Sequence, residues 1–330
     1  MFRKVMVPLD GSALAEQAIG PAAAIARAAE AELDLVMVLE PLPLTGFTDA
    51  DWGSATWAQD DTYLDGLAAE LATGASVPVT RAILQGVPAE VIGDRIAAKD
   101  TDLLVMTTHG RTGLSRAWVG STADRLVRHS SVPVLMLRPI EGKTRAAAAR
   151  HLFKRILVAL DGSPFAAEIL SAASALATCS EGRLVLLQVV QPVPLVVPES
   201  MVEGYPLAAY PPRIVDRAAT DRLVTEAEER LAETAHTLSG QGIECETQVV
   251  VAEHVAQAIL DAAARGGGDA IAMATRGRGA SRLFMGGIAD KVLRSSELPL
   301  LLRRPLAVGE PSLETTSVVA SAASATAAHT

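Results

Sequence analysis

Cysteine is scarce in this chain, and the few cysteines form no recognisable pattern. The 330 residues include two cysteines, Cys179 and Cys245, and no CxxC pair. A disulfide framework needs a larger even set of cysteines, and a structural zinc site needs several Cys or His ligands at close spacing. The sequence therefore excludes a disulfide framework and a structural zinc site, and we expect the two cysteines to be small buried hydrophobic residues.

Aromatic residues and long apolar runs are also missing. Phe, Trp and Tyr make up 3% of the chain, so the cores must be built mainly from Ala, Val, Leu and Ile. The longest apolar stretch, from Leu184 to Val197, is interrupted by two glutamines and two prolines and cannot form a spanning helix. The apolar run before Asp10 is too short for the core of a signal peptide. We therefore expect a cytoplasmic protein.

An excess of basic charge is absent as well. The formal net charge is −9 at pH 7, which gives no general attraction to phosphate backbones or anionic membranes. Neither nucleic acid nor a membrane surface is expected as a partner. The composition, with 49% hydrophobic and 20% charged residues, is typical of an α/β protein.

What the chain does contain is an internal repeat. The segment KVMVPLDGS, which begins at Lys4, recurs as RILVALDGS 151 residues later. The segment SRAWVGSTADRLVR, which begins at Ser115, corresponds to SRLFMGGIADKVLR 166 residues later. The difference places an insertion of about sixteen residues in the second copy, and its Pro-rich stretch from Gln191 to Pro212 is the natural surface loop for it. The length of the chain suits two domains of about 150 residues each.

Within each copy, short β-branched and Leu-rich runs alternate with Ala-rich helical stretches. This is the pattern of βαβ units around a buried parallel sheet, and it predicts an α/β fold of two tandem, doubly wound, five-stranded domains. Strands of the first copy are predicted at Lys4–Leu9, Glu32–Leu39, Pro78–Leu84, Asp102–Thr107 and Pro133–Leu137. Helices of the first copy are predicted at Ala13–Ala31, Asp61–Thr73, Pro88–Ala98 and Ser121–His129. Strands of the second copy are expected to begin near Arg155, Gly182, Glu244, Ala270 and Pro299.

The domain boundaries follow from composition. We predict a first domain over residues 1–140, a linker over 141–153, a second domain over 154–305 and a tail over 306–330. The linker is charged and Ala-rich, which fits a tether or a short helix. The tail is a low-complexity run of Ala, Ser, Thr and Val with no periodic apolar face, so we expect it to be disordered.

Chemistry is expected at the carboxyl ends of the strands, where open parallel α/β sheets bind their ligands. Asp10 stands at the end of the first predicted strand, followed by Gly11 and Ser12 before a helix. A carboxylate there can accept hydrogen bonds from a ribose or from an adenine amine. Capping of the helix explains the residue equally well, because Asp and Ser are routine N-caps.

A second place of interest follows the fourth predicted strand. Gly110 lies ten residues ahead of Gly120, which leads through Ser121 and Thr122 into a helix. Glycines let a backbone approach a ligand closely, and the free amides and dipole of a helix N-terminus favour a phosphate. An ordinary loop with a Gly-Ser cap is the alternative interpretation. Val38, at the end of the second strand, can press against an adenine ring or simply belong to the core.

The segments VPLDGS, MTTHGRTGLSRAWVGS and SVPVLML together resemble the universal stress protein family, and both copies carry the set. The ATP-binding members of that family show G-x2-G-x9-G-[S/T] after the fourth strand. The matching positions of the first copy are Thr107, Gly110, Gly120 and Ser121, and those of the second copy are Ala274, Gly277, Gly286 and Gly287. The first copy therefore lacks one glycine, and the second has a spacer one residue shorter and lacks the hydroxyl residue.

The resemblance implies a fold, a ligand and site residues. It implies an adenine nucleotide alpha hydrolase-like sheet of order 3-2-1-4-5 in each domain. Val134–Leu137 and Leu300–Leu302 are then short apolar edge strands, and because an unpaired apolar edge invites pairing, we expect an internal pseudo-dimer packed through these final strands. It implies ATP as the ligand, with Mg²⁺ as an ion that can accompany it. The first-copy residues matched to the nucleotide are Pro8, Leu9, Asp10, Val38, Met106, Thr107, Gly110, Arg111, Gly120, Ser121 and Thr122. The second-copy residues are Asp161, Val189, Met273, Ala274, Gly277, Gly286, Gly287 and Ile288.

Three functions remain open on this reading. The first is a stress-response regulatory protein that binds ATP with little or no hydrolysis. It would act through an unidentified protein partner and can form a homodimer. The second is an ATP-using enzyme, which the sequence disfavours because it has no SGGxDS loop, no HIGH or KMSKS-like segment and no Walker A motif. The third is a nucleotide-free scaffold with vestigial sites. No catalytic residue and no metal ligand are expected.

Overall fold

The chain alternates strands and helices in two successive copies of one pattern. The computed structural model describes residues 1–39, 50–75, 77–108, 120–140, 142, 153–195, 215–276 and 285–305. The strands of the first copy are β1 (Lys4–Leu9), β2 (Glu32–Leu39), β3 (Val79–Gln85), β4 (Leu103–Thr107) and β5 (Val134–Leu137). Its helices are the 3₁₀-helix η1 (Ala15–Ala18), α1 (Ile19–Ala29), α2 (Ala50–Ala75), α3 (Pro88–Ala98) and α4 (Ser121–His129).

The second copy repeats this order. Its strands are β6 (Arg155–Leu160), β7 (Arg183–Val190), β8 (Cys245–Val251), β9 (Ala270–Ala274) and β10 (Leu300–Arg303). Its helices are α6 (Pro164–Ala167), α7 (Ile169–Ser180), α8 (Arg217–Ser239), α9 (Val255–Arg265) and α10 (Gly287–Ser295). The predicted strands are thus confirmed to within one residue at their starts.

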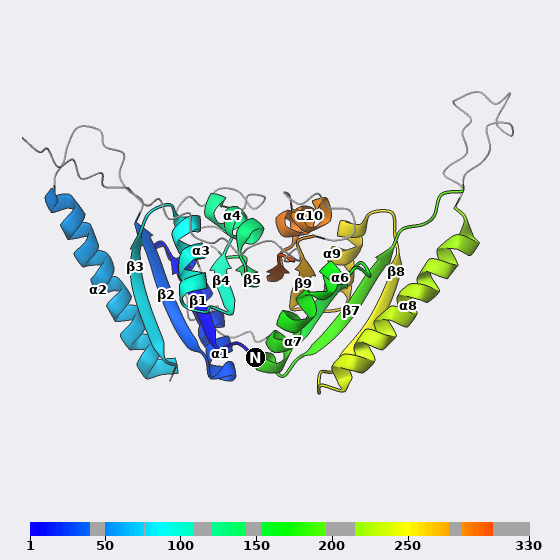
Figure 1. Ribbon diagram of the computed structural model, residues 1–330, viewed down its shortest axis with the longest axis horizontal. Coiled ribbons are helices and arrows are strands. Elements are labelled where there is room, and N and C mark those ends of the chain that lie inside the picture. The colour runs from blue at the N-terminus through cyan, green and yellow to red at the C-terminus, as the bar shows by residue number, and fades with distance from the viewer. Residues whose placement is uncertain are drawn as a thin grey trace, which may run out of the picture.

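All ten strands form one mixed sheet. Its order is β3-β2-β1-β4-β5-β10-β9-β6-β7-β8, so each half has the predicted order 3-2-1-4-5 and the halves meet at their last strands (Figure 1). Every pairing within a half is parallel, whereas β5 and β10 pair antiparallel, with Leu135 opposite Leu301. Each of these two short apolar strands covers the edge that the other would expose. The predicted internal pseudo-dimer is confirmed.

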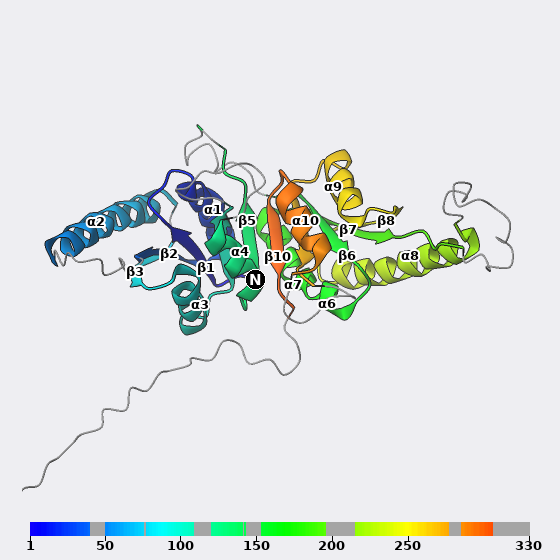
Figure 2. The same cartoon turned by 90° about the horizontal axis from the view of Figure 1, so that it is seen from above.

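Helices cover both faces of the sheet, and each face has a continuous core. One core contains Ile19 of α1, Leu64 of α2, Ile169 of α7 and Leu231 of α8. The core of the opposite face takes its helical residues from α3, α4, α9 and α10. Figure 2 shows α4 and α10 together above the junction of the halves, beside the paired strands β5 and β10. Because each core runs through both halves, folding of one half supports folding of the other.

The helices differ from expectation at two places. The predicted helix over residues 13–31 is split into η1 and α1, and its first part has the i+3 bond of a 3₁₀-helix: the N–H of Gln17 donates to the carbonyl of Leu14 at 3.3 Å. α1 ends at Ala29, and its C-cap residue Glu30 has a left-handed φ of 54°. The helix predicted to start at Asp61 begins earlier, at Ala50, and is correspondingly longer.

Several expectations concern other parts of the chain. Most of the Pro-rich stretch from Gln191 to Pro212, nearly all of the linker over 141–153 and the tail over 306–330 lie outside the described residues. Within the described ranges, no helix combines the length and the apolar character needed to cross a membrane.

Candidate functional site

A tight turn follows the first strand of each half. The N–H of Ser163 donates to Asp161 Oδ1 at 2.9 Å, and Ser163 Oγ accepts the N–H of Ala166 as the N-cap of α6. Gly162, between them, has φ 77°, a left-handed value that glycine adopts without strain. The helix cap is therefore supplied by the serine, and Asp161 is held by the turn at the carboxyl edge of the sheet.

The N-terminus of α10 reaches the same edge. The N–H of Gly286 donates to the carbonyl of Thr275, just after β9, at 2.8 Å. A Cβ on Gly286 would lie 3.3 Å from that carbonyl oxygen, so glycine allows the close approach. Gly286 gives α10 no side-chain cap. The first amides of the helix, from Gly287 and Ile288 onward, are thus available to an anion, which the helix dipole also favours.

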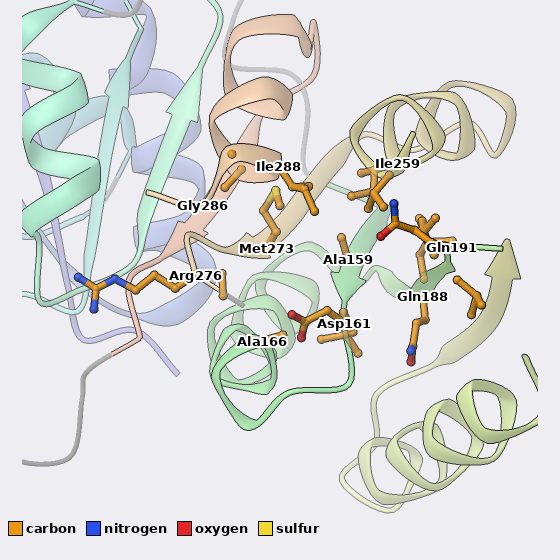
Figure 3. Close-up of a pocket in the computed structure, with 18 of the residues that line it drawn as sticks. Ala159, Asp161, Ala166, Gln188, Gln191, Ile259, Met273, Arg276, Gly286 and Ile288 are labelled. Carbon is orange, nitrogen blue, oxygen red and sulfur yellow. The ribbon is translucent and has the colours of Figure 1, made fainter. Parts of the chain in front are cut away.

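These two features border one cavity of about 720 Å³ in the second half. In Figure 3, Gly286 and Ile288 lie at one end, Gln188 and Gln191 at the other, and Asp161 between them. The described second-copy candidates all line this cavity: Asp161, Val189, Met273, Ala274, Gly286, Gly287 and Ile288. Gly277 lies outside the described residues. The structure therefore brings together residues that the sequence spreads over more than a hundred positions.

The first half places its candidates in the same way. Ser12 donates to Asp10 Oδ1 from its N–H at 3.0 Å and from its hydroxyl at 2.6 Å, and it also caps the N–H of Ala15. The N–H of Gly120 donates to the carbonyl of Thr108 at 2.9 Å, which ties the start of α4 to the end of β4. The remaining described candidates lie at the carboxyl ends of β1, β2 and β4 and at the start of α4: Pro8, Leu9, Val38, Met106, Thr107, Ser121 and Thr122. Gly110 and Arg111 lie outside the described residues.

Comparison with known proteins places this architecture. The model of the universal stress protein family matches residues 1–138 and 152–304. The chain belongs to the universal stress protein family. A universal stress protein of Methanocaldococcus jannaschii is 30% identical over 141 residues, which are 42% of this chain and 83% of that relative.

Solved structures show the tandem arrangement in other proteins. A universal stress protein from Archaeoglobus fulgidus matches with a TM-score of 0.63 at 19% identity, over 92% of this chain and 96% of that one. A functionally unknown protein from Pseudomonas aeruginosa matches with a TM-score of 0.55 at 16% identity, over 92% of this chain and 93% of that one. At these identities the likeness concerns the fold alone.

In this universal stress protein, an ion-pair cluster links the helices that begin at the two sites. Arg128 of α4 donates to both carboxylate oxygens of Asp124 at 2.8 and 2.9 Å, and Arg294 of α10 does the same to Asp290 at 2.9 and 3.1 Å. Arg128 also lies 3.6 Å from Asp290, across the boundary between the halves. The hydrogen bonds that Arg128 donates to Asp124 and that Arg294 donates to Asp290 raise the pKa of both guanidinium groups above the usual range.

The sequence interpretation missed the far end of the cavity. Gln188 and Gln191 of the β7 strand end, with Leu223, Glu226 and Arg230 of α8, line it as well. Gln188 interrupts an otherwise apolar strand, LVLLQVV, and a buried polar residue in such a run is the signal that could have revealed it. The contribution of α8 could not be seen in the same way, since the helix is far from the other lining residues in sequence.

Proposed function

We propose that this protein is a cytoplasmic stress-response regulator that binds an adenine nucleotide and hydrolyses it little or not at all. The observation that carries the proposal is the second-half cavity, in which a fixed carboxylate and an uncapped helix N-terminus border one space of about 720 Å³. A concave, largely apolar site with a few polar groups is the usual form of a small-molecule site.

The parts of a nucleotide match the parts of this cavity. The amides at the start of α10 suit the phosphates, and Asp161 suits the ribose hydroxyls. Val189 and Met273 offer apolar surface to a base. Among the described residues no group of three or more His, Cys, Asp and Glu could hold a metal ion. Mg²⁺ would therefore enter with the phosphates, which it commonly binds.

Low turnover is supported by the state of the nearby carboxylates. Phosphoryl transfer needs a group that positions the nucleophile and cations on the transferred phosphate. Asp124 and Asp290, each one turn into the helix whose N-terminus meets the site, are both engaged by arginines in two hydrogen bonds. A carboxylate held in this way is poorly placed to orient a water molecule.

The direct test is the identity of the bound ligand. Freshly purified full-length protein is denatured, and the released small molecules are analysed by mass spectrometry. ATP, ADP or AMP in roughly stoichiometric amount supports the proposal. Protein that releases no nucleotide, and that binds none in a subsequent ATP titration, refutes it.

A nucleotide-free scaffold is the second candidate, because Ala274 and Gly287 replace the glycine and the hydroxyl residue of the family pattern in the second half. The continuous ten-stranded sheet would then be the functional feature. Since β5 and β10 are paired within the chain, a homodimer would have to use other surfaces. The same mass-spectrometric experiment separates the two candidates.

A further inference from the structure

Gln188 is a polar residue at a core position, and the equivalent position of the first half is apolar. It pairs with Leu160 in the β6–β7 register, and the corresponding partner of Leu9 in the β1–β2 register is Met37. Gln188 is 5% exposed and Met37 is 1% exposed. The two halves thus use isosteric side chains at equivalent positions, one an amide and the other a thioether.

The amide oxygen of Gln188 is left without a hydrogen bond in the described part of the chain. Its Oε1 is buried and has no partner there. An unpaired buried carbonyl costs stability, and native proteins seldom retain one without a reason. Gln188 lines the same cavity as Asp161, so a bound molecule can supply the missing partner (Figure 3). The terminal torsion of a glutamine is soft, which lets the amide turn toward that partner.

Apolar residues share the cavity with Gln188. Leu160, which pairs with Gln188 in the β6–β7 register, and Leu223 of α8 both line it. Arg230, which also lines it, lies 3.7 Å from Glu226, so its charge is partly balanced by that carboxylate. The anion-binding end at α10 lies on the other side of Asp161 (Figure 3). A nucleotide whose phosphates meet α10 would therefore direct its base toward Gln188.

We propose that Gln188 is the specificity-determining residue of the second site, and that it selects adenine through the N6 and N7 atoms of the base. This rests on the proposed nucleotide-binding function. An amide can accept from the N6 amine through Oε1 and donate to N7 through Nε2, the pairing by which glutamine recognises adenine in DNA. Guanine and hypoxanthine present two acceptors, O6 and N7, at the same edge, and a single amide cannot satisfy both.

Nucleotide analogues test each half of this pairing. Full-length wild type and Gln188→Met are titrated with ATP, with 7-deaza-ATP, which lacks N7, and with ITP, which replaces the N6 amine by a carbonyl. The wild-type second site should bind both analogues about tenfold more weakly than ATP. Gln188→Met should lose about the same factor for ATP and should bind the three ligands alike at that site. Methionine should be accommodated because Met37 already fills the equivalent position.

Controls separate the possible failures. Gln248→Met makes the same change at an exposed β8 position away from the cavity and should leave the preference for ATP intact. The first half is unchanged in all variants, so any difference between them reports on the second site. If Gln188→Met keeps the wild-type preference, or the wild type binds all three ligands equally, the role of Gln188 is refuted while nucleotide binding stands. If no protein binds any nucleotide, the proposed function fails and this role fails with it.

Discussion

Arg95 of α3 holds the buried carboxylate of Asp34 with two hydrogen bonds. Its Nε and Nη2 donate to Asp34 Oδ2 and Oδ1 at 2.7 and 2.8 Å. Asp34 is 1% exposed, and its hydrogen bonds raise the pKa of Arg95 above the usual range. The equivalent residues of the second half, Val185 and Ala262, are apolar. At these equivalent positions the first half has a buried ion pair, whereas the second half has apolar side chains.

Removal of one partner of this pair should be costly. Asp34→Val leaves the Arg95 guanidinium largely buried and unpaired, and we expect the free energy of unfolding to fall by about 3–5 kcal/mol. Urea denaturation of the full chain measures this. The double variant Asp34→Val with Arg95→Met removes both charges and should be more stable than Asp34→Val alone. A double variant as unstable as the single one would show that packing, and not the orphaned charge, sets the cost.

Arg138 should stabilise the junction between the halves. It follows β5, and its guanidinium donates to the carbonyls of Leu293 at 2.6 Å, Arg294 at 3.1 Å and Ser296 at 3.0 Å, at the C-terminal end of α10. Burial lowers the pKa of Arg138, but at neutral pH the group stays charged. Arg138→Met should cost about 1–3 kcal/mol, because the carbonyls at the C-terminal end of α10 lose a charged donor.

The matched control for this change is an arginine in an exposed pair. Arg125 bonds Glu90 on the surface, with both side chains more than half exposed. Arg125→Met should change the free energy of unfolding by less than about 1 kcal/mol. Equal losses for Arg125→Met and Arg138→Met in urea denaturation would contradict the role of Arg138.

Acid should weaken the fold through Glu32. Thr80 donates to Glu32 Oε1 at 2.6 Å and Lys4 lies 3.1 Å from Oε2, and these contacts lower the pKa of Glu32 below its ordinary value of 4.5. A carboxyl with a lowered folded pKa contributes stability above the unfolded pKa and loses it as the pH falls through the folded one. Glu32→Gln should therefore be less stable than wild type at pH 7, with the difference shrinking below pH 4.5. The control is Glu233→Gln at an exposed position of α8, which should change the free energy of unfolding at pH 7 by less than Glu32→Gln does in urea denaturation.

Much of the fold could be predicted from the sequence because its signals are local. The apolar runs define the strands, and the repeated LDGS turns define their carboxyl ends, so Asp10 and Asp161 could be placed at the edge of the sheet in advance. The last strand of each copy is short and apolar. The pairing of these two strands could be predicted because an apolar sheet edge must be covered.

The contacts that sequence reasoning missed depend on tertiary structure. Asp34 and Arg95 are 61 residues apart, and nothing in either segment specifies the other as a partner. The approach of Arg128 to Asp290 requires the antiparallel register of β5 and β10. Gln188 stands out within its apolar strand, but the sequence does not show that it shares a cavity with residues of α8, because the two elements come together only when the second half folds.

The two sites should differ in affinity. Ser121 and Thr122 begin α4 with hydroxyl donors, whereas Gly287 and Ile288 begin α10 with none, and each lost hydrogen bond to a charged phosphate costs about 1.5–3 kcal/mol. The first site should therefore bind ATP at least tenfold more tightly. Calorimetric titration of full-length Gly286→Val reports the first site, and that of Gly120→Val reports the second. A further variant, Ser121→Ala with Thr122→Val, leaves the second site intact. The ATP affinity of its first site should fall close to that of the second site. Equal affinities, or a tighter second site, would contradict the argument from hydroxyl donors.

ATP should be bound without efficient turnover. Substitutions of Gly120, the N-cap of α4, and of Asp124, in the first turn of that helix, test this. A Cβ on Gly120 would lie 3.5 Å from the nearest protein atom, the carbonyl oxygen of Thr108, so the protein tolerates it. The branched side chain of Gly120→Val would instead occupy the space of the phosphates and abolish ATP retention at the first site. Asp124→Ala removes a carboxylate already committed to Arg128, which remains 3.6 Å from Asp290, and should leave retention largely intact. Radiolabelled ATP hydrolysis should stay far below about 1 per second in the wild type and in both variants. Wild-type turnover at or above that rate, lost in Asp124→Ala, would make the protein an ATP-hydrolysing enzyme with Asp124 as its base.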